Sequence, residues 1–243
     1  MPARGGSKNI PYKNLTPLAG RPLLDYGVLA ARACACLDRI ICSTEDGRIA
    51  NRARHLGIEV DNRPVLLAGD MIQVEDVVQE MLTRRLGDGG ERLPDILVLV
   101  QPTSPFLRTE HIDTLLNAML AVPECRSGQN ITLIPHNHHA LNQRFFENGH
   151  AIFKFEKERR VAYNKQKKDQ LYGFGNLYAV RTHAILDGDT FFAQPSVATV
   201  IPRPYDFDLD GMDDTPLAEA FLAVGLIDLP HLSQWPMELC AGV

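Results

Sequence analysis

The chain has 243 residues, 45% of them hydrophobic, which is enough for one large α/β domain with a substantial core. Its formal net charge of −5 argues against a general nucleic-acid-binding surface, so we expect no nucleic-acid partner. No apolar run approaches the length of a membrane span, and the N-terminus lacks the apolar core of a signal peptide, so we expect no membrane association.

The first segment, residues 2–15, combines two glycines, a serine and several cations in a turn-rich stretch. Small residues let backbone N–H groups approach an anion closely, and Arg4, Lys8 and Lys13 bring positive charge to the same place. This composition is typical of a loop that holds a polyphosphate. A flexible, basic N-terminal tail is the alternative interpretation.

Helix-like and strand-like segments alternate after this loop, which predicts an α/β sheet. Thr44 and Thr109 are each placed to cap a helix. The segment 96–100 is apolar at every position, as expected for a parallel strand covered on both faces. Helices are expected over residues 23–35, 44–57, 74–86 and 109–119 and from residue 216, and strands over 39–43, 96–100, 176–180 and 197–201.

The alternation changes around Asn148-Gly149, where two short segments rich in aromatic and β-branched residues flank a turn signal. Residues 136–172 are therefore predicted to form an antiparallel insertion within a single domain that spans residues 1–243.

The start of the chain departs from the usual order of a doubly wound nucleotide fold, in which the phosphate loop follows the first strand. Here the loop begins at residue 2, so we expect that the first strand is missing from this chain. A typical strand has about 5–6 residues, and each large apolar side chain that it buries contributes roughly 1.5–3 kcal/mol. We therefore expect reduced stability.

Two acidic residues near the end of the chain could bind a metal ion. Asp208 and Asp210 alternate on a segment expected to be extended, so both carboxylates point the same way. Two oxygen ligands on one face suit Mg²⁺ bound to phosphates. The alternative is that they are acids at the start of the helix near Pro216. The presence of the phosphate-type loop at residues 2–15 favours metal binding over the helix-start interpretation.

The order Arg-Gly-Gly-Ser-Lys-x-x-Pro-x-Lys-Asn from residue 4 resembles the nucleotide loop of the acylneuraminate cytidylyltransferases, which are the CMP–sialic acid synthetases and their legionaminate, pseudaminate and KDN relatives. Further stretches that resemble motifs of this family lie at residues 18–24, 43–46, 63–70, 101–108 and 207–210. The resemblance implies a Rossmann-like nucleotide-diphospho-sugar transferase fold with a mostly parallel sheet. It also implies that the antiparallel insertion is a dimerisation arm.

The resemblance assigns roles to individual residues. Those implied to bind the nucleotide are Arg4, Ser7, Lys8 and Lys13 at the triphosphate and Asn14 and Arg63 at the cytosine. Those implied to lie by the sugar acid are Gln101, His139, Gln166 and Tyr178. The resemblance also implies catalytic roles for Arg4, Lys13 and Asp210, and Mg²⁺ bound by Asp208 and Asp210. The sugar pocket departs from the family pattern, because Asn142, Lys165 and Phe174 replace its lysine, arginine and asparagine.

The implied reaction is the attack of a nonulosonic (sialic-acid-like) sugar acid on the α-phosphorus of CTP, which gives a CMP-sugar and pyrophosphate. The partners are then CTP, the sugar acid and a second copy of the chain in a homodimer. One alternative is a glycosyltransferase that uses Asp208 and Asp210 to hold a nucleotide-sugar. Another is a degenerate homologue that binds nucleotide without turnover. The five cysteines are odd in number and fit no zinc pattern, so we expect reduced thiols in the cytoplasm.

Overall fold

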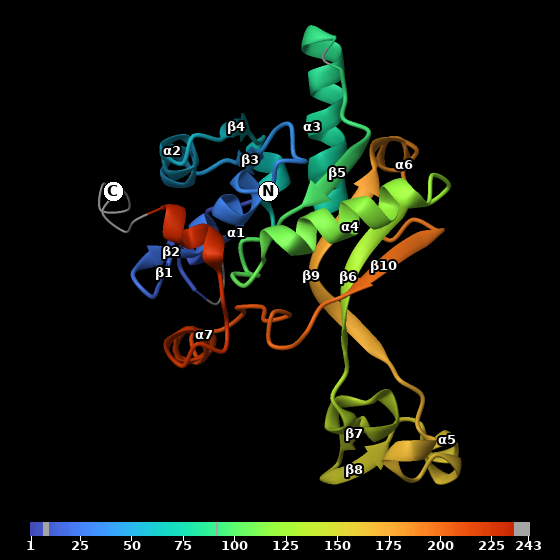
Figure 1. Cartoon of the computed structure of the whole chain (residues 1–243). Helices are drawn as coiled ribbons and strands as arrows, with labels where there is room; N and C mark the ends of the chain where they lie inside the picture. The colour runs from blue at the N-terminus through green and yellow to red at the C-terminus, as the bar shows by residue number, and fades with distance from the viewer. Residues whose placement is uncertain (7–9, 91, 236–243) are drawn as a thin grey trace.

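A computed structural model of the chain describes residues 1–6, 10–90 and 92–235, without the side chains of residues 86–89 (Figure 1). Ser7, Lys8 and Cys240 lie outside the described residues. The helices are α1 (Leu23–Arg32), α2 (Gly47–His55), α3 (Val74–Gly89), α4 (Thr109–Ala121), α5 (Glu156–Val161), α6 (Thr182–Leu186) and α7 (Asp214–Ala223). The strands are β1 (Pro17–Leu18), β2 (Arg21–Pro22), β3 (Ile41–Thr44), β4 (Glu59–Asn62), β5 (Ile96–Leu99), β6 (Ser127–Leu133), β7 (Arg144–Glu147), β8 (His150–Phe153), β9 (Tyr172–Arg181) and β10 (Ser196–Val200).

The predicted alternation of helices and strands is confirmed. The larger sheet has the strand order β10-β6-β9-β5, and β3 pairs with β4 in a separate parallel ladder. Because β9 runs antiparallel to both of its neighbours and β10 is parallel to β6, the strands β5, β6 and β10 share one direction. Helix α4 covers this sheet, and its residues Ile112, Leu115 and Met119 are buried in one apolar cluster with Leu177 of β9 (Figure 1). Among the described helices, none is both long and apolar enough to cross a membrane.

Residues 1–3 lie beside β3 and pair with it in parallel. The amino group of Met1 donates to the carbonyl of Ile41 at 2.8 Å, the Ser43 N–H donates to the Met1 carbonyl at 2.9 Å, and the Ala3 N–H donates to the Ser43 carbonyl at 3.0 Å. No regular strand is assigned ahead of residue 4. Between this segment and β5 lies a cavity of about 670 Å³, which we call the interstrand cavity. Its lining includes Met1 and Ile41 on one side and Leu97 on the other.

The two predicted threonine caps are wrong, although the helices that they were expected to begin are present. Thr44 is the last residue of β3, and its hydroxyl accepts a hydrogen bond from the Asp46 N–H at 3.1 Å. Asp46 itself caps α2, because its side chain accepts from the N–H groups of Arg48 and Ile49. Thr109 instead donates its hydroxyl proton to the carbonyl of Ala30 at 3.1 Å, which ties the start of α4 to α1.

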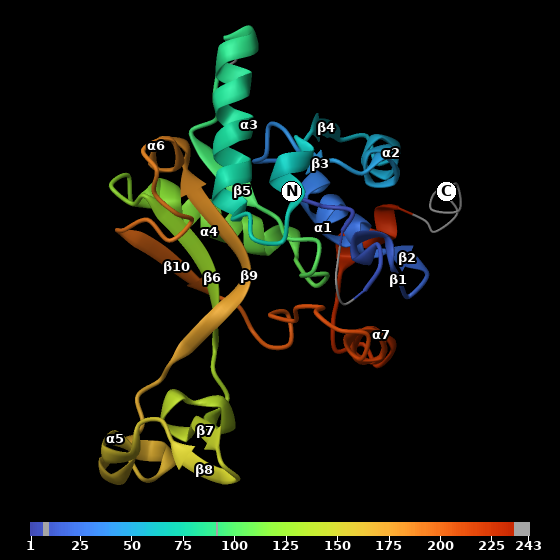
Figure 2. The same cartoon turned by 180° about the vertical axis from the view of Figure 1, so that it is seen from behind.

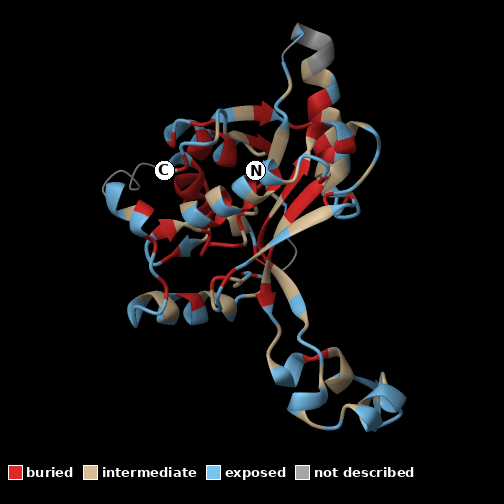
Figure 3. Ribbon diagram, turned by 45° about the vertical axis from the view of Figure 1, so that its right-hand side comes forward, coloured by how far each residue is buried: buried red, intermediate tan, exposed pale blue. Residues whose placement is uncertain are grey.

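The predicted antiparallel insertion between residues 136 and 172 is present as a separate projection, carried on the long strands β6 and β9 (Figures 1 and 2). At its tip, β7 and β8 form the expected hairpin. Asn148 has φ 49° and Gly149 has φ 81°, the left-handed conformations that a two-residue hairpin turn requires. The residues of the insertion are mostly exposed, in contrast to the buried centre of the main body (Figure 3).

A buried ion pair joins α1 to α2. The side chains of Asp25 and Arg52 are both fully buried, and the Arg52 Nε donates to Asp25 Oδ1 at 2.9 Å, with a second contact between Arg52 Nη2 and Asp25 Oδ2. This pair fixes the two helices that pack around β3, and β3 in turn carries residues 1–3 at the start of the loop.

Candidate active site

The N-terminal loop is fixed by hydrogen bonds in the described residues before and after positions 7–9. The Gly5 N–H donates to Glu45 Oε1 at 2.7 Å, and a Cβ atom at Gly5 would lie 2.5 Å from Asp46 Oδ2. Position 5 therefore requires glycine, because any side chain would collide with the residue that caps α2. Further along, the Asn14 side-chain amide donates to the Arg4 carbonyl at 2.9 Å, so Asn14 helps to fix the loop backbone.

Two cations of the loop are paired with carboxylates from elsewhere in the chain. Arg4 Nη1 lies 2.6 Å from Asp70 Oδ1, and Lys13 Nζ lies 3.2 Å from Asp210 Oδ1. The Lys13 side chain is only 13% exposed whereas that of Asp210 is 79% exposed, so the ammonium group is fixed and the carboxylate faces solvent. This second pair brings the phosphate-type loop together with the predicted metal site.

Asp208 and Asp210 lie ahead of α7, which begins at Asp214, so they are not part of its first turn. The Leu209 N–H donates to the Thr103 carbonyl at 2.8 Å and fixes this segment against the turn that follows β5. Asp214 Oδ2 accepts from the backbone N–H groups of Asp210 and residue 211, each at 2.7 Å. Asp214 therefore shapes the backbone that presents Asp210.

The electrostatics of these carboxylates fit a divalent cation. Although Asp208 reaches solvent, partial desolvation raises its pKa, and the nearby charges of Asp210 and Asp214 raise it further. A hydrogen bond from the Thr103 side chain and the charge of Lys13 oppose this rise in pKa. The effect of Asp210 on the pKa of Asp208 indicates that the two carboxylates lie close together, and they could supply oxygen ligands to Mg²⁺.

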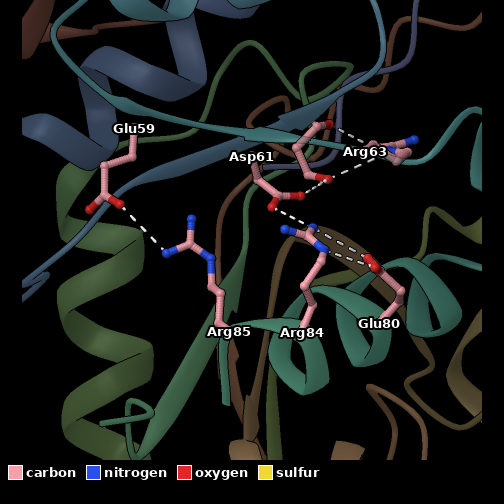
Figure 4. Close-up of polar contacts among 7 residues, drawn as sticks. Glu59, Asp61, Arg63, Glu80, Arg84 and Arg85 are labelled. Carbon is pink, nitrogen blue, oxygen red and sulfur yellow. Dashed lines mark hydrogen bonds and ion pairs between the residues drawn. The ribbon is translucent and has the colours of Figure 1, made fainter. Parts of the chain in front are cut away.

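Arg63 is buried, so its guanidinium is not part of a surface ion pair. Its Nη2 donates to the Ser43 carbonyl at 2.7 Å and its Nε to the Ser43 hydroxyl at 3.4 Å (Figure 4). Desolvation lowers the pKa of Arg63, and the charge of Arg4 lowers it further. The Ser43 hydroxyl in turn donates to Asp61 Oδ2 at 2.9 Å, and Arg84 Nη2 donates to Asp61 Oδ1 at 2.7 Å. Arg63 is thus held at the end of β3, close to Arg4.

The sequence did not single out Asp61 or Arg84, because neither lies in a recognisable motif. The pairing of β3 with β4 places Ser43 opposite Asp61, and Arg84 of α3 reaches Asp61 from outside this ladder (Figure 4).

Gln101 and Tyr178 come from neighbouring strands of the larger sheet. Gln101 follows β5, and its carbonyl accepts from the Ser104 N–H at 3.2 Å, in the turn that carries Thr103. Tyr178 pairs with Leu99 of β5 and stacks on Phe174 with ring centroids 4.0 Å apart. Burial raises the pKa of Tyr178, and the charge of Asp208 adds to this, so the phenol lies within electrostatic reach of the acidic pair.

Asn176 was not identified from the sequence, which marked it only as the start of a strand. Its Nδ2 lies 3.0 Å from His111 Nδ1 and donates to the Tyr205 carbonyl at 3.0 Å, while its Oδ1 accepts from Asn130 at 3.0 Å. This buried amide joins β6, β9 and α4 to the segment that leads to Asp208. A polar residue inside an otherwise apolar strand was the available signal.

The structure does not bring His139 and Gln166 to the loop of the same chain. Both belong to the projecting insertion, which lies apart from the N-terminal segment (Figures 1 and 2). His139 is buried, with its Nε2 3.1 Å from the Asp169 carbonyl and its Nδ1 accepting from the Leu141 N–H at 3.1 Å. Gln166 lies in an exposed 3₁₀ turn.

Comparisons with known proteins identify the family of the chain. The sequence model of a family described as cytidylyltransferase matches residues 1–199. The CMP-N,N'-diacetyllegionaminic acid synthase of Legionella pneumophila is 37% identical over 113 residues, which cover 46% of this chain and 48% of that protein. The match thus spans about half of that relative. The pseudaminic acid cytidylyltransferase of Campylobacter jejuni is 22% identical over 226 residues, covering 92% of this chain and 95% of that protein.

Among solved structures, a CMP:2-keto-3-deoxy-manno-octonic acid synthetase complexed with CTP has a TM-score of 0.68 and 16% identity, covering 92% of this chain and 97% of that one. At this identity the likeness shows the fold alone, and it confirms the predicted Rossmann-like α/β architecture.

Proposed function

Because the chain belongs to the cytidylyltransferase family, we propose that it transfers the cytidylyl group of CTP to a nonulosonic sugar acid and releases pyrophosphate. The observation that carries this proposal is the contact of Lys13 with Asp210. It places a cation of the phosphate-type loop directly against a pair of carboxylates that suits a phosphate-bound metal ion.

Each residue of the site then has a positioning or charge-neutralising role. Arg4 and Lys13 exchange Asp70 and Asp210 for phosphate oxygens of CTP. Ser7 and Lys8, which lie outside the described residues, belong to the same stretch of sequence. Asp208 and Asp210 would hold Mg²⁺, which neutralises charge on phosphate oxygens and lowers the pKa of a hydroxyl that it binds. The hydroxyl of the sugar acid attacks in line, so the barrier falls mainly through orientation and electrostatics.

The cytosine is assigned to Asn14 and Arg63. Arg63 lies at the end of β3 with its guanidinium fixed on Ser43, and Asn14 fixes the loop at Arg4. An arginine and an amide can both hydrogen-bond the O2 and N3 edge of a pyrimidine. CTP should therefore be preferred to UTP.

The sugar acid is assigned to Gln101 and Tyr178 of one chain and to His139 and Gln166 of a second copy. This assignment needs a homodimer in which the insertion reaches the partner. Exposed apolar side chains on the insertion support such an interface, namely Phe146 at 81%, Val161 at 75% and Tyr163 at 63% exposure. A stable dimer of this kind buries at least roughly 2,000 Å² in total, and light scattering at micromolar concentration should report two copies. A monomer there contradicts the shared site.

The cytoplasmic location is also proposed. It is supported by the free thiols of Cys34, Cys36, Cys42 and Cys125 among the described residues.

The test is pyrophosphate release from CTP and Mg²⁺ with a panel of nonulosonic acids, compared between Asp210→Asn and the matched control Asp213→Asn. Asp213 is exposed and its side chain caps nothing. Asp210→Asn should lose activity by a factor on the order of 10²–10³, as when a charge-stabilising group is removed from an active site. Asp213→Asn should keep it.

Near-full activity of Asp210→Asn with an unchanged Mg²⁺ requirement contradicts the metal assignment. Equal turnover with UTP contradicts the assignment of Asn14 and Arg63. CTP binding without pyrophosphate release from any acid identifies a homologue without turnover, and transfer from a nucleotide-sugar without pyrophosphate release identifies a glycosyltransferase.

A further inference from the structure

Outside the candidate active site, three metal-ligating side chains meet at one point, and we call them the thiol cluster: Cys34, Cys36 and Asp113. The sulfur atoms of Cys34 and Cys36 are 2.8 Å apart, and they lie 3.1 and 3.0 Å from the same oxygen, Asp113 Oδ1. It is the one such group of three found among the described residues. No motif predicts it, because Asp113 is 77 residues from Cys36 in the chain.

The two elements that carry the thiol cluster are fixed relative to each other. Cys34 follows the last turn of α1, and its N–H donates to the Ala31 carbonyl at 3.1 Å. Asp113 lies in the second turn of α4, one turn after Thr109, whose hydroxyl bonds the Ala30 carbonyl of α1. The ligand-bearing backbones are therefore already in place without a metal, which lowers the ordering cost of binding one.

The thiol cluster is closed on one side and open on the other. Cys34 is 4% exposed, Cys36 is exposed and Asp113 is partly buried. A tetrahedral ion with metal–sulfur distances of about 2.3 Å holds its two sulfur atoms roughly 3.8 Å apart. The exposed Cys36 side chain can rotate outward to reach that separation, while Cys34 stays packed.

We propose that the thiol cluster binds a thiophilic divalent cation of the Zn²⁺ class between α1 and α4. The two sulfur atoms and the Asp113 carboxylate supply three ligands, and water takes the fourth position on the open side. Binding releases the two thiol protons to solvent, so the complex has the charge of two thiolates, one carboxylate and the cation.

The chemistry separates this site from the one proposed for Mg²⁺. Sulfur ligands select soft cations, whereas the carboxylates of Asp208 and Asp210 suit hard ones. A metal at the thiol cluster links the end of α1 to the helix that directly follows the turn carrying Gln101 and Thr103. Its expected effect is stabilisation of the fold, so its test does not depend on the proposed enzyme activity.

The test uses full-length, reduced, metal-free protein with Cys240→Ser, which removes a thiol outside the described residues. Titration with Cd²⁺ should produce one equivalent of ultraviolet thiolate-to-metal charge transfer, and Zn²⁺ should displace it. At about 100 times its dissociation constant, Zn²⁺ should raise the melting temperature by roughly 5–10 °C. Excess Mg²⁺ should not compete.

Three variants assign the ligands. Cys36 is exposed and Asp113 is partly buried, so Cys36→Ser and Asp113→Asn should both fold and lose Zn²⁺ affinity by at least roughly tenfold. Cys125→Ala, which removes a buried thiol elsewhere, is the matched control and should keep the charge-transfer band. Unchanged affinity in Cys36→Ser overturns the proposal. A Cys34–Cys36 disulfide formed in air, with no stoichiometric metal binding by the reduced protein, also overturns it and identifies a redox pair.

Discussion

Lowering the pH from about 7 to about 4.5 should remove a large part of the free energy of unfolding, because two buried histidines stay neutral in the folded protein. Burial lowers the pKa of His111 to about 4, and the charge of Arg108 contributes to this. Burial likewise lowers the pKa of His231 to about 4. His111 Nδ1 faces the Asn176 amide at 3.0 Å and the Arg108 backbone N–H at 3.3 Å, so a proton there would set donor against donor.

The magnitude follows from the size of the pKa shift. The pKa of each histidine falls from 6.5 in the unfolded chain to about 4 in the folded protein. One pKa unit corresponds to about 1.36 kcal/mol, so acidification through this range removes roughly 3 kcal/mol of the free energy of unfolding per histidine. Between these two values the unfolded chain binds protons that the folded protein does not. Stability is therefore complete above pH ~6.5 and falls as the pH decreases toward ~4, with a limiting slope of roughly 2.7 kcal/mol per pH unit for two groups.

The assay is urea unfolding at several pH values across this window. His111→Asn should reduce the slope by about half, because the asparagine oxygen can accept the same hydrogen bonds without titrating. His150→Gln, which alters an exposed residue at the hairpin tip, is the control and should leave the slope unchanged. A free energy of unfolding that stays constant between pH ~6.5 and ~4.5 refutes the reasoning, as does an unchanged slope in His111→Asn.

Two further predictions concern the ion pair between α1 and α2 and the interstrand cavity beside residues 1–3. Asp25→Asn should cost about 3–5 kcal/mol, because it removes the carboxylate charge that faces the buried Arg52 guanidinium, and should lower the melting temperature by roughly 6–20 °C. Adding Arg52→Met should restore most of that loss, and an additive double mutant would contradict the pairing. An apolar, strand-forming extension of about five residues before Met1 should fill part of the interstrand cavity and raise the melting temperature by several degrees. A Gly-Ser extension of equal length should not, and equal effects of the two would show that the cavity does not accept a strand.

Local chemistry was enough to predict the elements whose causes lie within a few residues. Asn148-Gly149 fixes a hairpin turn by its own left-handed conformations, so that prediction is confirmed wherever the hairpin sits in the fold. The predicted cap of α2 was wrong, although the prediction used the same local reasoning. Thr44 and Asp46 are both good capping residues, and the choice depended on β3 extending to Thr44 through its pairing with Asn62.

Contacts between distant residues could not be predicted from spacing. Nothing near Asp25 indicates that Arg52 will be its partner, and nothing near Asp113 indicates two thiols. The loop and the acidic pair were each recognised, but their meeting through Lys13 and Asp210 is a property of the fold. The same limit applies to Asn176, whose partners come from three other segments.

The distance along the chain between Lys13 and Asp210 has a consequence for biosynthesis. The two residues are 197 positions apart, and at about 5–20 residues per second a ribosome needs roughly 10–40 s to add that much chain. Throughout this interval Lys13 exists without Asp210. The site is therefore completed only after residue 210 has been added, and a nascent or truncated chain that stops before residue 208 lacks both carboxylates.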